Sequence, residues 1–167
     1  MEKVTIQTLV VAPAPSPSIL VLCPTKDFET NRSCRVIPIW LGAPEAMQVG
    51  IALEGKKLGR PLTHDLLLDA LTNLDARVDR VEIHDVQGHT FYAHLILRTG
   101  ERIITLDARP SDAVALAIRQ DAPIYMSEHV IDAASYPYVF NNSATDEKEL
   151  DDFREFVQSL SPEDFQE

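Results

Sequence analysis

The spacing of hydrophobic and polar positions divides the chain into strands and helices. Residues 90–97 alternate with the two-residue period of a β-strand, because Phe91, Ala93, Leu95 and Leu97 share one face and Thr90, Tyr92, His94 and Ile96 the other. Similar aliphatic and β-branched runs predict strands over 5–11, 18–23, 35–41, 78–84, 89–97 and 101–106. Helical spacing predicts helices over 44–54, from 63 through Leu67, Leu71 and Leu74, over 111–120, around 128–133 and over 149–160.

One stretch of the sequence occurs twice. Residues 35–52 resemble residues 102–119, which follow 67 positions later, and a strand runs into a helix in both copies. Glu45 of the first copy corresponds to Asp112 of the second. Two copies predict two supersecondary units that share one core, because a solenoid needs at least three. We therefore expect an α+β fold in which two internally duplicated units, each of three strands and two helices, form one pseudo-symmetric domain.

Charge is concentrated at the C-terminal end. The 167 residues carry a net charge of −11, and from residue 141 onward nine acidic side chains accompany only Lys148 and Arg154, a balance of −7. Residues 1–140 therefore hold −4. We predict a domain over 1–140 and an acidic segment over 141–167 that contains an amphipathic helix and contacts a protein partner. The acidic balance weighs against tight, sequence-independent DNA binding, but it is compatible with a compact site that cuts nucleic acid.

Neither a membrane span nor a secretion signal is predicted. The sequence has no run of about 18 apolar residues, and the apolar stretch 9–12 is too short for a signal peptide, so we expect a cytoplasmic protein without membrane contact. Cys23 and Cys34 are the only cysteines, and they would lie close together if 18–23 and 34–39 pair as a hairpin. In a reducing compartment we expect both to be free thiols.

The polar segment 107–112 is the strongest candidate site. It lies where a strand ends and a helix starts, a place where backbone N–H groups attract anions. Arg109 is suited to a phosphate, and Asp107 and Asp112 to a hard cation such as Mg²⁺. In the structural alternative, Ser111 and Asp112 are ordinary first-turn residues and Arg109 simply pairs with an acid.

A second candidate is His64 beside Asp65, at the predicted start of a helix. A histidine next to a carboxylate can act as a general base or donate a proton. The alternative is that Thr63 and Asp65 cap the helix while His64 belongs to the core. Glu45 either approaches the same region through pseudo-symmetry or only compensates a helix dipole. By contrast, His84, His89 and His94 lack metal-ligand spacing, and we interpret them as hairpin residues.

Four ordered motifs resemble the bifunctional nuclease (BFN) domain family over about residues 1–133. They are RPLTHDLL at 60–67, GHTFYA at 88–93, DARPSDAVALA at 107–117 and APIY at 122–125. The resemblance implies a duplicated α+β fold, a homo-oligomer, and hydrolysis of both DNA and RNA.

The resemblance leads to a working hypothesis of metal-assisted phosphodiester hydrolysis. Glu45, Asp107 and Asp112 would bind Mg²⁺ or Mn²⁺, with no organic cofactor, and Arg109 would stabilise the pentavalent phosphate. His64 with Asp65 would activate water or protonate the leaving oxygen, and Ser111 completes the candidate catalytic set.

Two other functions remain open. One is a non-catalytic ligand-binding or regulatory module, in which the helix terminus at Arg109 captures a small phosphorylated or carboxylated molecule. The other is a purely structural oligomer, for which no ligand would shift the melting temperature.

Overall fold

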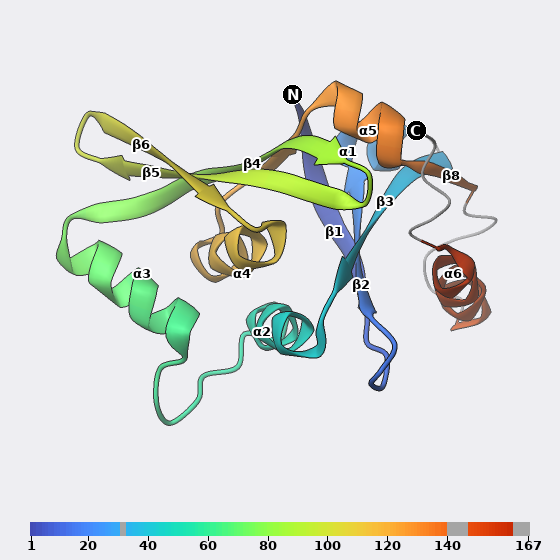
Figure 1. Ribbon diagram of the computed structural model, residues 1–167, viewed down its shortest axis with the longest axis horizontal. Coiled ribbons are helices and arrows are strands. Elements are labelled where there is room, and N and C mark those ends of the chain that lie inside the picture. Colours follow the sequence, from blue (N-terminus) through green and yellow to red (C-terminus); the bar gives the residue numbers. More distant parts are fainter. Residues whose placement is uncertain (31–32, 140–146, 162–167) are drawn as a thin grey trace.

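The computed structural model describes residues 1–30, 33–139 and 147–161 (Figure 1). The strands are β1 Glu2–Val10, β2 Ser18–Pro24, β3 Ser33–Leu41, β4 Ala76–Gln87, β5 Thr90–Thr99, β6 Arg102–Ala108, β7 Ile124–Met126 and β8 Tyr136–Val139. The helices are α1 Thr25–Thr30, α2 Ala43–Leu53, α3 Thr63–Asn73, α4 Pro110–Gln120, α5 Glu128–Ala134 and α6 Glu147–Ser159. The predicted strands and helices are confirmed, and α1, β7 and β8 are additional elements that the hydrophobic pattern did not indicate.

All eight strands form one sheet in the order β6-β5-β4-β7-β1-β2-β3-β8. Strands β1, β2 and β3 pair antiparallel in sequence, as do β4, β5 and β6, and the short β7 lies between the two groups. Strand β3 leads into α2 and β6 leads into α4, which confirms a strand running into a helix in both similar segments. The α+β class is therefore correct, and the origin of the two halves by duplication stays a prediction.

The sheet separates two hydrophobic clusters. Successive side chains of β2 point to opposite faces of the sheet. Leu20 and Leu22 belong to the larger cluster on one face, and Val21 and Cys23 belong to the smaller cluster on the other. Helices α2, α3 and α4 gather below the sheet in Figure 1, and they cover the larger cluster. Helix α6 lies apart, beside β8, and it covers the smaller cluster with Phe153 and Val157.

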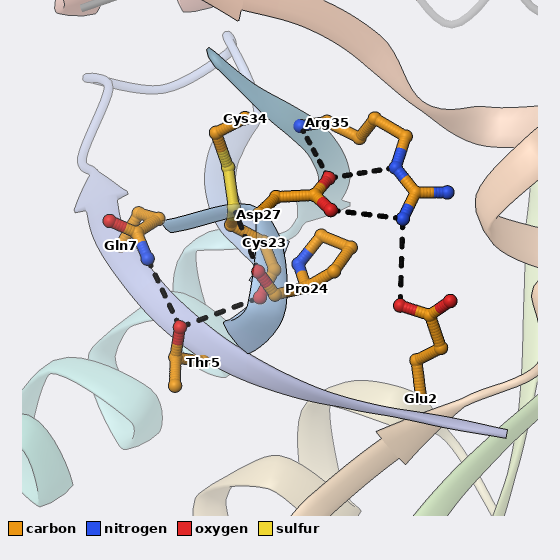
Figure 2. Close-up of a disulfide and its surroundings, with 8 residues drawn as sticks. All are labelled: Glu2, Thr5, Gln7, Cys23, Pro24, Asp27, Cys34 and Arg35. Carbon is orange, nitrogen blue, oxygen red and sulfur yellow. Dashed lines mark hydrogen bonds and ion pairs between the residues drawn. A yellow bond between two sulfur atoms is a disulfide. The ribbon is translucent and has the colours of Figure 1, made fainter. Parts of the chain in front are cut away.

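Cys23 and Cys34 form a disulfide, so the prediction of free thiols is wrong (Figure 2). The predicted hairpin is correct, since β2 and β3 pair antiparallel with Leu22 opposite Ile37. This pairing brings the end of β2 and the start of β3 together, and the two Cα atoms lie 6.3 Å apart. That separation is within the range that a disulfide spans.

Helix α3 differs from its prediction in two ways. Its N-cap is Leu62 rather than Thr63, and the Asp65 carboxylate accepts the Leu62 N–H at 2.9 Å. Its buried line also runs through Leu68 and Leu71, whereas the predicted Leu67 and Leu74 are exposed. A run of consecutive leucines fits more than one helical stripe, and packing against α4 and β4 selects one of them.

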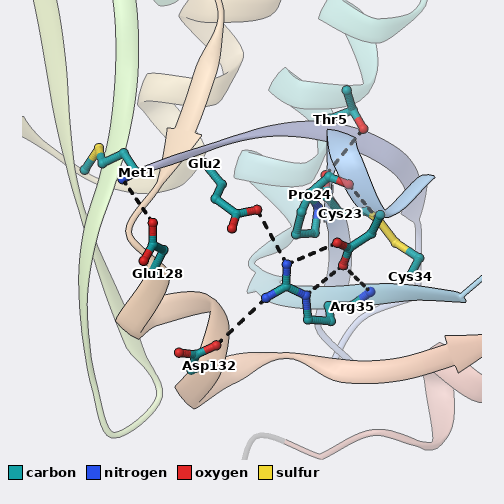
Figure 3. Close-up of polar contacts among 10 residues, drawn as sticks. Met1, Glu2, Thr5, Cys23, Pro24, Cys34, Arg35, Glu128 and Asp132 are labelled. Atoms are coloured by element: carbon teal, nitrogen blue, oxygen red, sulfur yellow. Dashed lines mark hydrogen bonds and ion pairs between the residues drawn. A yellow bond between two sulfur atoms is a disulfide. The ribbon is translucent and has the colours of Figure 1, made fainter. Parts of the chain in front are cut away.

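A cluster of charged side chains around Arg35, near the start of β3, connects four elements (Figure 3). The Arg35 Nε atom donates to Asp27 Oδ2 at 2.7 Å, and its guanidinium also reaches Glu2 and Asp132. These contacts connect β3 with α1, β1 and α5.

Within the described residues, no helix combines the length and apolar character needed to cross a membrane.

Candidate functional site

A pocket of about 320 Å³ opens where β3 ends and where α2 and α4 begin. The turn between β4 and β5 closes another side. The pocket is lined by Ile39, Trp40, Leu41, Gly42, Glu45, His89, Thr90, Phe91, Arg109, Pro110 and Ser111. Apolar walls with a few convergent polar groups are typical of a small-molecule or active site.

The two helices begin in the same way. Gly42 and Arg109 are the N-cap residues of α2 and α4, and both have extended backbone dihedrals and lack a side-chain cap. Both helices have a proline in the first turn. Proline suits this position because an N–H group in the first turn has no carbonyl partner within the helix, so its absence costs nothing. Glu45 and Asp112 each occupy the third helical position, where a negative charge stabilises the positive end of the helix.

Arg109 connects these two helix starts. Its Nη1 atom donates to Glu45 Oε1 at 2.9 Å, and its Nε atom donates to Asp112 Oδ2 at 2.8 Å. The Asp112 and Glu45 carboxylates raise the pKa of Arg109 above its ordinary value. The arginine side chain is 65% exposed, so its guanidinium is open to a ligand while two carboxylates hold it. The predicted approach of Glu45 to Arg109 and Asp112 is therefore present in the fold.

His64 contacts this cluster from inside the protein. Its Nε2 atom lies 3.2 Å from Asp112 Oδ1, and its side chain is only 13% exposed. The Nδ1 atom is buried and has no hydrogen-bond partner within the described residues. Burial raises the pKa of Asp112, but hydrogen bonds from Arg109 and His64 outweigh it, and the net pKa lies below the ordinary value. Neither His64 nor Asp112 lines the pocket, and His64 contacts Asp112 on the side away from it; a catalytic role for either residue stays a prediction.

Asp65 makes hydrogen bonds that hold α3 in place. Besides accepting the Leu62 amide, it accepts Arg119 Nε at 2.8 Å. The Leu62 amide contributes most to lowering the pKa of Asp65, and the Arg119 guanidinium adds to the effect. Arg119 also donates to the carbonyl oxygens of Gln48 and Ala115, so these bonds join α3 to α2 and α4. A catalytic role for Asp65 stays a prediction.

Asp107 lies on the other face of the sheet. It is opposite His94 in the β5–β6 ladder, whereas the neighbouring Leu95 and Ala93 face the larger hydrophobic cluster under α4. The predicted metal ligands Glu45, Asp107 and Asp112 are thus not assembled, and Arg109 already occupies the space between two of them. In the described part of the chain, no three His, Cys, Asp or Glu side chains are placed to hold a metal ion.

Ser111 and Gly42 contribute to the pocket in different ways. Ser111 is only 8% exposed, and its hydroxyl makes no hydrogen bond within the described residues, although the residue lines the pocket. Gly42 leaves room for Glu45, because a Cβ atom at position 42 would lie 2.6 Å from Glu45 Oε2. Glu45, Arg109 and Ser111 are thus the predicted site residues that line the pocket.

Three aromatic pocket residues, Trp40, His89 and Phe91, were not among the predicted site residues. Trp40 occupies the position of the first copy that corresponds to Asp107 in the second, and this difference was the available signal. His89 and Phe91 belong to the motif at 88–93, which marks them as candidates, but the spacing of the three histidines alone indicated only a hairpin.

Comparisons with known proteins agree with this arrangement of motifs. A family model described as the bifunctional nuclease domain matches residues 28–138. Two similar proteins of Mycobacterium tuberculosis are the uncharacterized protein MT1877 of strain CDC 1551 / Oshkosh and the uncharacterized protein Rv1829 of strain ATCC 25618 / H37Rv. Each is 42% identical over 136 residues, which cover 78% of this chain and 81% of the relative. The chain therefore belongs to the bifunctional nuclease domain family.

Proposed function

We propose that the protein is a nuclease that hydrolyses phosphodiester bonds of DNA, RNA or both at the pocket beside Arg109. The observation that carries this proposal is the exposed guanidinium of Arg109, placed on the pocket wall together with Glu45. A guanidinium can bind two phosphate oxygens at once, and a neighbouring carboxylate can accept a proton from water. Family membership supports the same reaction class.

In the proposed binding step, a phosphate oxygen replaces Glu45 on the Arg109 guanidinium. Ser111 supplies a second donor, because its hydroxyl lines the pocket without a protein partner within the described residues. The backbone N–H groups in the first turn of α4 add a favourable dipole. Asp112 and its partner His64 keep the arginine oriented, so we assign His64 a positioning role.

In the proposed chemical step, the released Glu45 carboxylate takes a proton from a water molecule. The water oxygen forms a bond to phosphorus, Arg109 stabilises the pentavalent phosphate, and the bond to the leaving oxygen then breaks. His89 donates a proton to that leaving oxygen, because it is an exposed imidazole on the opposite pocket wall. The proton lost by water and the proton gained by the leaving group therefore balance.

A role for Mg²⁺ or Mn²⁺ is a separate hypothesis, and no step above depends on one. The set Glu45, Asp107 and Asp112 does not fit a single ion in this fold, because Asp107 faces away from the pocket. Cleavage assays with Mg²⁺, Mn²⁺ or EDTA decide whether a metal takes part.

The test is cleavage of labelled single-stranded DNA, duplex DNA and RNA by the wild type and by the variants Arg109→Gln, Glu45→Gln and His89→Ala. Removing a donor that stabilises a developing charge costs about 10²–10³ in kcat. Removing a general acid or base costs about 10²–10⁴. The matched control is Arg77→Gln, which removes an exposed arginine of β4 that does not line the pocket. Equal cleavage by all identically purified preparations would reveal a contaminant and contradict the proposal.

A second candidate function is a binding module for a small anion. The pocket volume is at the lower end of the range for small-molecule sites, and Arg109 is the only lysine or arginine among the described residues that line it. These features suit one phosphorylated or carboxylated molecule better than a long strand. Absence of cleavage, together with a mononucleotide-dependent rise in melting temperature that Arg109→Gln removes, would favour this function.

Oligomerisation and partner binding are also proposals. We propose a homo-oligomer in the cytoplasm and a protein partner for the acidic segment 141–167. Part of that segment lies outside the described residues, and its helix α6 packs on the smaller hydrophobic cluster. A cytoplasmic location would require the Cys23–Cys34 disulfide to persist in a reducing compartment, and cell fractionation tests this proposal.

A further inference from the structure

Strand β6 forms one edge of the sheet, and within the described residues no strand pairs with its outer side (Figure 1). It pairs with β5 from Arg102 to Ala108 without a register shift, so its outer side is a regular row of backbone N–H and C=O groups. No residue of β6 is buried, and Ile103 and Leu106 are 45% and 43% exposed. A regular, partly apolar edge of this kind is a template for another strand.

The opposite edge of the sheet, at β8, is protected. Strand β8 has only four residues, and one of them is Pro137, which cannot donate a hydrogen bond to a neighbouring strand. Helix α6 packs beside it, because the Tyr138 ring contacts the rings of Phe153 and Phe156. Strand β6 has seven residues and contains neither proline nor lysine, the residues that commonly prevent pairing at an edge. We therefore expect another strand to cover β6 but not β8.

We propose that β6 pairs antiparallel with β6 of a second copy of this chain, so that the two sheets become continuous. The charges of the strand favour this direction. Arg102 lies at one end of β6 and Asp107 near the other, so antiparallel pairing brings ends of opposite charge together. In-register parallel pairing would instead place like charges opposite each other. Each copy uses its β6 edge once, so the pairing closes as a dimer and does not grow into a fibre.

The two faces of β6 restrict the register. A two-fold axis between the strands keeps each side chain on its own face of the sheet, so residues opposite each other are an even number of positions apart. With Thr105 on the axis, Ile104 lies opposite the partner subunit's Leu106, on the face of the larger hydrophobic cluster. The same apolar pair forms again on the other side of the axis. Arg102 lies opposite the partner subunit's Ala108, whose small side chain leaves room for the arginine.

Neighbouring registers are less favourable. An axis at Ile104 would set the preceding Glu101 opposite the partner subunit's Asp107, and carboxylates directly opposite each other are destabilising. An axis at Leu106 would leave the first residues of β6 without an opposing strand, because β6 ends where α4 begins. Only the central axis pairs all seven residues and places no like charges opposite each other. The proposal specifies the surface of the proposed homo-oligomer and does not depend on the nuclease reaction.

The test is the mass of the full chain in solution, measured by sedimentation over a range of concentrations. The wild type should have twice the mass of one chain. Thr105→Lys places two ammonium groups opposite each other at the axis and should raise the dissociation constant of the dimer at least about tenfold. The matched control is Thr72→Lys, which introduces the same charge at an exposed threonine of α3 and should leave the dimer intact.

A second variant separates loss of pairing from misfolding. Thr105→Glu alone should also be monomeric, and mixing it with Thr105→Lys should restore a dimer with one chain of each, because opposite charges then meet at the axis. Arg109→Gln should remain dimeric, so a failed nuclease proposal and a failed interface give different results.

Three results would overturn the interface. The first is a wild type that stays monomeric up to about 100 µM. The second is a Thr105→Lys variant that dimerises as tightly as the wild type. The third is a mixture of the two charged variants that does not assemble.

Discussion

Gly42 and Glu45 show how one missing side chain shapes the pocket. The Glu45 carboxylate folds back toward the start of α2, and its Oε2 atom occupies the space where a Cβ atom at position 42 would lie. Its other oxygen accepts Arg109 Nη1. The backbone of Gly42 is extended, so alanine fits its dihedral angles, and the conflict concerns only the carboxylate.

We predict that Gly42→Ala displaces Glu45 from Arg109 and lowers nuclease activity with little loss of stability. The control is Gly50→Ala on the same helix, where the added Cβ atom would meet Leu9 Cδ2 at an ordinary 3.5 Å. Alanine is better than glycine inside a helix by about 0.5–1 kcal/mol, so Gly50→Ala should be neutral or stabilising and fully active. Activity assays and urea unfolding of both variants check this, and an unimpaired Gly42→Ala enzyme would contradict the role of Glu45.

Helix α6 illustrates how an element gains its place from packing. Its surface is strongly acidic, yet Phe153 and Val157 are buried against the smaller cluster, which contains Cys23 and Cys34. The Phe153 ring also meets Tyr138 of β8 edge-on, at a centroid distance of 4.7 Å. The predicted amphipathic helix is therefore a docked element rather than a free acidic arm.

We expect Phe153→Ala to lower the free energy of unfolding by about 3–5 kcal/mol, the usual cost of truncating a buried aromatic residue. Glu155→Ala, on the exposed side of the same helix, should change it by less than about 0.5 kcal/mol. Loosening α6 should also expose the disulfide, so dithiothreitol should reduce Phe153→Ala faster than the wild type. Equal unfolding energies for the two variants would show that α6 adds no stability.

The molecule as a whole should resist mild acid and lose stability in strong acid. Folding lowers the pKa of five described aspartates through hydrogen bonds, and these are Asp27, Asp65, Asp79, Asp85 and Asp112. Such a group favours the folded state when it is ionised. Its contribution is complete above the unfolded value of about 3.9 and is lost as the pH falls through the lower folded value.

We therefore predict that these groups leave stability unchanged between about pH 7 and pH 5 and reduce it below about pH 4. Asp27→Asn should flatten this decline, because the Arg35 hydrogen bond is the main cause of the lowered pKa of Asp27. Unfolding in urea at a series of pH values checks the prediction. A wild-type stability that is constant down to pH 2.5 would be inconsistent with it.

Local sequence patterns were sufficient to predict the periodic elements and the family. Two-residue alternation along β5 and helical spacing along α2 and α4 are local properties, and they identified these elements correctly. The polar segment 107–112 also marked the helix start that lines the pocket. Where the local pattern fitted more than one helical stripe, as for the leucines of α3, the prediction was correct for Leu71 and wrong for Leu67 and Leu74.

Which of these residues meet depends on how the strands pair and the helices pack. Glu45 and Arg109 are 64 positions apart and share a hydrogen bond, whereas Asp107, two positions from Arg109, lies on the opposite face beside His94. Strand β6 ends at Ala108 and Arg109 caps α4, so Arg109 does not continue the alternation that would place it on the face of Asp107. Sheet pairing also brings distant strands together. Hairpin pairing likewise joined Cys23 to Cys34. Contacts of this kind depend on register and packing across the whole sheet, and local sequence patterns do not carry that information.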